Sequence, residues 1–209
     1  SRLPKISSLK LQEGLQYPVS LNQSQMLTIH SMDPGSAAYN MPTGIWLTGP
    51  VSVQALRCAL RDLQLRHSVL RTTYRTCDSG DGFSQVVCAL EDDPLFAIQV
   101  DDEKQAMSIM ARDARTGFQL LGGRPIRCHL LSVRNAGKHL LILNCHHICF
   151  DGVSAAIFLR EFSGLCKHHA ADPNGGNVAD ICDELPFQYV DFARWQERLL
   201  KEHPMMESQ

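Results

Sequence analysis

Several short stretches of the chain are rich in apolar, β-branched and aromatic residues and are bounded by turn residues, which predicts strands. Two pairs of these stretches are joined by segments with turn chemistry, residues 78–82 and 135–138, so each pair is expected to form an antiparallel hairpin. The predicted strands span residues 41–47, 70–76, 83–87, 96–100, 126–133 and 139–144.

Elsewhere apolar residues recur every three or four positions, which predicts amphipathic helices. Ser52 precedes one such stretch and is expected to cap its helix. Further helices are expected from Ser20 or Asn22 to just before Pro34, over residues 103–115, after a cap at Ser154, and over residues 190–203; residues 171–177 have the composition of a loop. Strands interspersed with helices predict an α/β fold, more exactly described as an α+β sandwich with a mixed, largely antiparallel sheet and flanking helices.

Composition places the chain among ordinary globular proteins. Its 209 residues carry 20 basic and 22 acidic side chains, a net charge of −2, and 44% of them are apolar. This is enough for one domain or a large lobe with its own core. No apolar run approaches the roughly 20 residues of a membrane helix, and no basic cluster suggests nucleic-acid binding.

The cysteines and histidines raise the question of a metal site. The eight cysteines are spread singly along the chain, which favours reduced thiols in a cytoplasmic protein over a disulfide framework. A zinc hypothesis is suggested by Cys and His residues between positions 145 and 169, but they lack the paired, turn-compatible spacing of structural zinc sites. We therefore expect no metal.

The strongest candidate for chemistry is the segment of residues 146–152, placed where an apolar strand meets the start of a helix. Adjacent histidines on a strand point to opposite faces, so one of His146 and His147 can face a substrate while the other packs behind it. Histidine accepts a proton near neutral pH, and a positioned base contributes about 10²–10⁴ in rate. Asp151 is suited to hold the turn or orient an imidazole, and Gly152 to allow an unusual backbone shape or close approach of a ligand. By spacing alone, a purely structural turn remains an alternative.

Four segments resemble, in order, motifs of the condensation domains of nonribosomal peptide synthetases, which belong to the chloramphenicol-acetyltransferase-like acyltransferases. Residues 146–152 match the signature HHxxxDG. Residues 20–27 are similar to the opening motif SxAQxRLW, residues 66–74 to RHExLRTxF, and residues 189–195 to YxDYAxW. The opening segment keeps Ser and Gln at positions 20 and 23 but has Gln and Leu at 25 and 27, where Arg and Trp are usual.

The resemblance implies a chloramphenicol-acetyltransferase-like lobe, one of two that enclose a reaction tunnel. It implies an N-terminal arm over residues 1–16, the N-terminal lobe of a condensation domain over residues 17–203, and the start of a connection to a C-terminal lobe at 204–209. Alone, such a lobe is expected to be inactive. The implied parent is a multidomain nonribosomal peptide synthetase or hybrid polyketide synthase of natural product biosynthesis.

The same resemblance implies the roles of the site residues. His147 is expected to be the catalytic histidine of amide bond formation, either as the base for the attacking amine or by positioning it and stabilising the tetrahedral intermediate. His146 and Gly152 are expected to support the motif, and Asp151 to hold it through a salt bridge to Arg71, with Arg66 as the second candidate.

Substrates are expected as thioesters on the 4′-phosphopantetheine of donor and acceptor carrier proteins, with no cofactor bound directly to the chain. Carrier proteins, the C-terminal lobe and adjacent synthase domains are the expected partners, without nucleic acid or membrane. Two alternatives remain open. One is a non-catalytic docking lobe that binds a carrier protein or neighbouring synthase domain, and the other is a related HxxxD acyltransferase.

Overall fold

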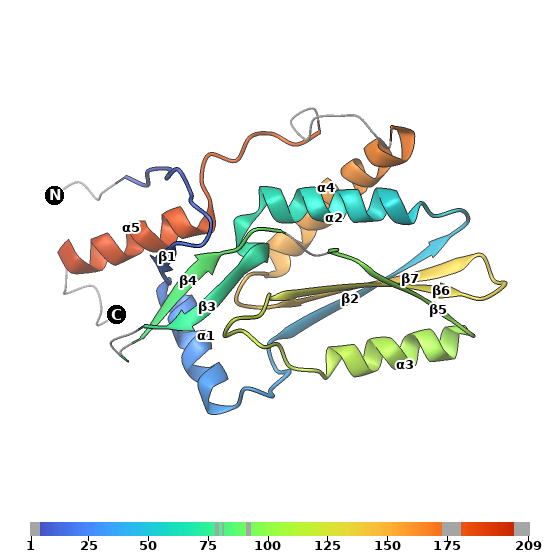
Figure 1. The fold of residues 1–209 in the computed structure, drawn as a ribbon, viewed down its shortest axis with the longest axis horizontal. Coiled ribbons are helices and arrows are strands. Elements are labelled where there is room, and N and C mark those ends of the chain that lie inside the picture. The colour runs from blue at the N-terminus through green and yellow to red at the C-terminus, as the bar shows by residue number, and fades with distance from the viewer. Residues whose placement is uncertain (1–4, 78–79, 81, 91–92, 173–180, 203–209) are drawn as a thin grey trace.

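A computed structural model describes residues 5–77, 80, 82–90, 93–172 and 181–202 (Figure 1). The strands are β1 (Gln16–Pro18), β2 (Asn40–Thr48), β3 (Thr72–Thr76), β4 (Phe83–Val87), β5 (Phe96–Val100), β6 (Ile126–Val133) and β7 (Lys138–His146). The helices are α1 (Leu21–Met32), α2 (Val53–Arg66), α3 (Glu103–Ala114), α4 (Gly152–Ala171) and α5 (Tyr189–Glu202), with a short 3-10 helix η1 (Ser68–Arg71). None of these helices is long and apolar enough to cross a membrane.

The main sheet has four strands in the order β2-β7-β6-β5. β7 pairs antiparallel with both of its neighbours, and only β5 pairs parallel, with β6. In the turn between β6 and β7, Asn135 and Gly137 have φ values of 56° and 57°, in the left-handed region that Asn and Gly adopt most readily. The predicted hairpin and the mixed, largely antiparallel sheet are confirmed.

Strand β7 is buried on both faces, which makes it the centre of the fold. Alternate residues Leu141, Leu143 and Cys145 belong to the core under α2 and α4. Leu140 and Ile142 face the other way and pack with residues of α3. Figure 1 shows α2 and α4 across one face of the sheet and α3 across the other. Each fully buried Leu or Ile contributes about 1.5–3 kcal/mol, so β7 is firmly held up to its last residue.

A second sheet, in the order β1-β4-β3, was not expected beyond its hairpin. Helix α1 packs against it through Leu27 and Tyr74, which are fully buried. Residues 70–71, predicted as the start of the third strand, belong instead to η1. That prediction was wrong because Leu70, the apolar residue there, is buried in a tight helical turn as well as it would be in a strand.

The helix starts follow the sequence closely, with one exception. Ser20 and Ser52 cap α1 and α2 through hydrogen bonds from backbone N–H groups three residues later. The expected cap at Ser154 is wrong, because the Asp151 carboxylate accepts the Ser154 N–H and α4 begins at Gly152. The predicted loop over residues 171–177 lies outside the described residues from position 173 onward, as does His203 at the end of the predicted last helix.

Candidate active site

The backbone of the two histidines is clamped between two other segments. His146 N–H donates to Pro125 O at 2.8 Å, and His147 N–H donates to Tyr39 O at 2.9 Å. Pro125 directly precedes β6 and Tyr39 directly precedes β2, the two neighbours of β7 in the sheet. The end of β7 is therefore fixed from both sides, as predicted for histidines at a strand end.

The His146 ring is buried, with 3% of the residue exposed, and lies near the rings of Tyr39 and Phe118, each with its centroid 5.9 Å away. Ile148 N–H donates to its Nδ1 at 3.0 Å, so the neutral ring carries its proton on Nε2. Burial, with smaller effects of His30 and His147, lowers the pKa of His146 to about 4. His146 is thus a neutral packing group at physiological pH.

His147 is the first residue of the turn that follows β7, and it is exposed, whereas His146 at the last position of the strand is buried. Within the described part of the chain no hydrogen bond is made by its imidazole. The ring is thus rigidly attached through its backbone and open to a bound molecule. The structure separates the two histidines into a buried ring and an accessible one.

Asp151 does not form the expected ion pair with Arg71 or Arg66. Its Oδ1 accepts the Ser154 N–H at 2.7 Å and the Ser154 hydroxyl at 2.6 Å, at the exposed start of α4. These two hydrogen bonds are the main reason why the pKa of Asp151 is lowered, and the nearby His147 adds to them. Asp151 holds the motif by starting the helix that follows it.

Arg71 is committed elsewhere. It is buried and donates to Glu13 Oε1 and Cys88 O, each at 2.6 Å, and to Gln64 O at 3.0 Å. It therefore ties the N-terminal arm and the end of α2 to the segment after β4. Arg66 pairs with Glu161 of α4 at 3.2 Å. The carboxylates that compete for these arginines, Glu13 and Glu161, lie 58 and 95 residues away along the chain, where no local sequence pattern reveals them.

Gly152 does not need the conformational freedom of glycine. Its φ is not positive, and apart from its chain neighbours and the backbone of its own helix, no described atom lies within 4 Å of where a Cβ would stand. The expectation of an unusual backbone shape is therefore wrong. The expectation of close approach by a ligand stays a prediction, and the open space beside Gly152 is compatible with it.

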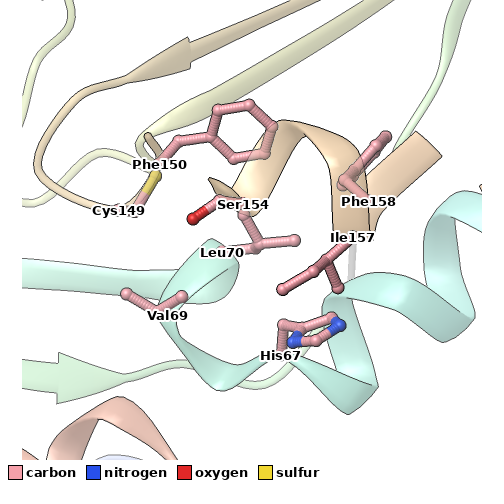
Figure 2. Close-up of a pocket in the computed structure, with 8 residues that line it drawn as sticks. All are labelled: His67, Val69, Leu70, Cys149, Phe150, Ser154, Ile157 and Phe158. Carbon is pink, nitrogen blue, oxygen red and sulfur yellow. The ribbon is translucent and has the colours of Figure 1, made fainter. Parts of the chain in front are cut away.

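A cavity of about 90 Å³ lies behind the motif loop (Figure 2). Its walls come from the end of α2, η1, the loop and the first turns of α4, and are formed by His67, Val69, Leu70, Cys149, Phe150, Ser154, Ile157 and Phe158. His147 does not line it, so this cavity is not where a reacting group meets that imidazole. Among the described residues no group of three or more His, Cys, Asp or Glu side chains is placed to hold a metal ion.

The other three motifs are joined to one another in the core. Ser20 and Gln23 form a capping box at the start of α1, and the Gln23 amide donates to Tyr74 Oη at 3.2 Å. Ser20 Oγ also lies 3.0 Å from Tyr189 Oη. These motif residues therefore support the fold rather than lining the exposed side of His147. Sequence reasoning missed Tyr39, Phe118 and Pro125, which contact the histidines without belonging to any motif.

A family model described as "Condensation domain" matches residues 14–209. The chain is 34% identical over 190 residues to phosphinothricin tripeptide synthetase PhsC of Streptomyces viridochromogenes, covering 88% of this chain and 17% of that one. It is 31% identical over 192 residues to surfactin synthase subunit 2 of Bacillus subtilis, covering 91% and 5%. The chain thus spans a small part of the curated relatives that it matches.

Solved structures share the fold. The X-domain in its complex with OxyB from teicoplanin biosynthesis gives a TM-score of 0.81 at 23% identity, covering 100% of this chain and 43% of that one. The starter condensation domain of rhizomide synthetase RzmA gives 0.72 at 18% identity, covering 94% and 45%. The resemblance inferred from the four motifs is confirmed: the chain belongs to the condensation-domain family of nonribosomal peptide synthetases.

Proposed function

We propose that this chain is the histidine-bearing N-terminal lobe of a condensation domain that forms amide bonds between carrier-bound substrates, with the lobe over residues 17–203. The observation that carries the proposal is the separation of the two histidines. His147 is exposed on a clamped backbone, whereas His146 is buried behind it and neutral. A rigid, accessible imidazole is what a positioned acid–base group requires.

In the proposed reaction, the amine of an acceptor aminoacyl thioester attacks the thioester carbonyl of the donor. A C–N bond forms, the C–S bond breaks, and the donor carrier keeps the released thiol. His147 accepts a hydrogen bond from the attacking amine, holds it against the carbonyl, and takes its proton as the bond forms. The proton then passes to the departing sulfur, which leaves as the thiol and restores the neutral imidazole. Both substrates arrive on the phosphopantetheine of carrier proteins, so the chain needs no cofactor of its own.

Gly152 and Asp151 have complementary supporting roles in this proposal. Asp151 fixes the start of α4 through Ser154, and Gly152 leaves open space directly after it. A second lobe completes the site by covering the exposed side of His147. The isolated 209 residues are therefore expected to be inactive.

The test is mass spectrometry of carrier-bound product, made by the full-length protein with loaded donor and acceptor carriers. We expect amide product from the wild type and a loss of at least about 10²-fold with His147→Ala. His139→Ala is the matched control, because His139 lies at the opposite end of β7 from the motif and its ring hydrogen-bonds to the Ser132 hydroxyl there.

A folded wild-type protein that forms no amide with several donors would contradict the proposal and favour the docking function. Undiminished product from His147→Ala would remove His147 from the chemistry while leaving the reaction in place.

A further inference from the structure

The C-terminal end of α3 collects polar side chains from three strands, outside all four motifs. Asn40 of β2 donates to Ala114 O and Thr116 O at 2.9 and 2.8 Å. Asn144 of β7 donates to Asp113 Oδ2 at 2.7 Å and to Asp113 O at 3.1 Å. Two side chains of β6 also reach this end: Arg127, and His129, whose Nε2 stands 3.7 Å from Asp113 Oδ1. Carbonyl groups at a helix end lack intrahelical partners and carry the negative end of the helix dipole, so a cation and amide donors suit them.

Arg127 makes four hydrogen bonds with this helix end. Nε donates to Asp113 Oδ1 at 2.8 Å, Nη2 donates to Thr116 O at 2.7 Å and Asp113 O at 3.0 Å, and Nη1 donates to Gly117 O at 3.1 Å. The Asp113 side chain is 9% exposed and that of Arg127 is 24% exposed. Only the planar fork of a guanidinium satisfies this geometry, since a lysine has a single nitrogen.

The same arginine reaches His146 through one ring. Its guanidinium carbon stands 3.9 Å from the centroid of Phe118, a cation–π contact. The Phe118 ring meets the His146 ring edge-on, with an interplanar angle of 86° and centroids 5.9 Å apart. Phe118 is 3% exposed, so it has no room to move independently of either neighbour.

The backbone of the histidines is reached by the same helix end. Asn40 lies opposite His146 in the β2–β7 ladder, and Tyr39 beside it accepts the His147 N–H. Gly117 also brings this end against the chain before β2, because a Cβ there would stand 2.7 Å from Gly35 O. The helix end therefore holds both the ring of His146 and the segment that clamps His147.

We propose that Arg127 is a positioning residue for His147, acting through Phe118, His146 and the end of α3. This inference rests on the proposed function of His147. In this proposal the partly buried pair of Arg127 and Asp113 fixes geometry rather than adding net stability. A misplacement of about 1 Å at a reacting group costs up to about 10²-fold in rate. Arg127 does not touch the substrate side, where the His147 ring is exposed.

The test compares Arg127→Gln with wild type in the full-length protein. Arg134→Gln is the matched control, because Arg134 follows the same strand but forms only an exposed pair with Asp101. Hydrogen–deuterium exchange of the peptide containing residues 144–150 reports on the amides of His146, His147 and Ile148, each of which is hydrogen-bonded in the structure. We expect exchange there to be at least about 10-fold faster in Arg127→Gln and unchanged in Arg134→Gln.

Steady-state amide formation supplies the second readout. We expect kcat to fall about 10- to 100-fold with KM within about threefold, because an interaction made for the transition state is lost. Unchanged exchange of residues 144–150 together with unchanged kcat would overturn the proposal. So would a loss of kcat that matches the fraction of unfolded protein.

Two further variants keep the test decisive if Arg127→Gln does not fold. Arg127→Lys keeps the charge without the fork, and Phe118→Leu removes only the ring contact. Wild-type exchange and kcat in both would overturn the proposal. The exchange measurement does not depend on turnover, so it still decides the role of Arg127 if the wild-type protein forms no amide. A wild-type protein that forms no amide would contradict the proposed function, not the role of Arg127.

Discussion

The two ends of the motif at residues 146–152 are held by opposite means. The His146 end is fixed by long-range contacts: a buried ring between Tyr39 and Phe118, and backbone bonds to segments that directly precede two different strands. The Asp151 end is fixed locally, by two exposed hydrogen bonds to Ser154. One continuous motif therefore combines a tertiary anchor with a helix cap, and the two ends should respond differently to mutation and pH.

The largest effect is expected from removing a ring at the tertiary anchor. Phe118→Ala should lower the free energy of unfolding by about 3–5 kcal/mol, because a buried aromatic side chain is lost and a cavity remains. Urea unfolding measures this. Phe96→Ala is the control, since Phe96 is 61% exposed, and it should cost less than about 1 kcal/mol. Equal losses of unfolding free energy in Phe118→Ala and Phe96→Ala would contradict a tertiary anchor at the His146 end of the motif.

Acid should weaken the His146 end next. The pKa of His146 is about 4 when folded, below the ~6.5 of an unfolded histidine, so the unfolded chain binds more protons between these values. The contribution of neutral His146 to the free energy of unfolding is therefore complete above about pH 6.5 and is lost as the pH falls towards 4. It amounts to up to about 3 kcal/mol. Unfolding curves between pH 7.5 and 4.5 should be less steeply pH-dependent in His146→Asn than in wild type. Identical slopes would show that His146 is not held neutral.

A smaller effect is expected at the local end. Asp151→Ala should cost about 0.5–2 kcal/mol, the value of a helix N-cap, rather than the roughly 3–5 kcal/mol of a broken buried ion pair. Asp151→Ser should recover most of the loss, because serine also caps helices. The measurement is the urea midpoint of the two variants. A loss above about 3 kcal/mol that Asp151→Ser does not repair would restore the ion-pair interpretation.

The smallest change in stability is expected at Gly152. Gly152→Ala should leave the free energy of unfolding unchanged or raise it by up to about 1 kcal/mol, because alanine favours helices and, apart from the chain neighbours and the backbone of the same helix, no described atom lies within 4 Å of the added Cβ. If a substrate approaches this backbone closely, the same variant should lose at least about 10-fold in kcat/KM. Undiminished activity would remove the close-approach role.

The parts that sequence reasoning predicted depend on local pattern. The hairpin of β6 and β7, the spacing in α2 and the caps at Ser20 and Ser52 are all confirmed, because neighbours along the chain determine them. The prediction that Asp151 pairs with Arg71 was wrong, since the buried guanidinium binds Glu13, 58 residues away. Likewise, nothing in the sequence near Phe118 indicates that it touches His146. Tertiary pairing of polar and aromatic groups has no short-range pattern.

Strand register decides which of the two histidines is buried and which is exposed. Asn40 lies opposite His146 in the β2–β7 ladder, and side chains along β7 alternate between faces. Deleting one residue from the interior of β7 would bring the next residue into each position and turn the strand over relative to its sheet. His147 would then take the buried place of His146, His146 that of Cys145, which is 2% exposed, and Ile148 the exposed place of His147. The exposure of one imidazole is thus a property of the count of residues along one strand, and not only of the histidine pair itself.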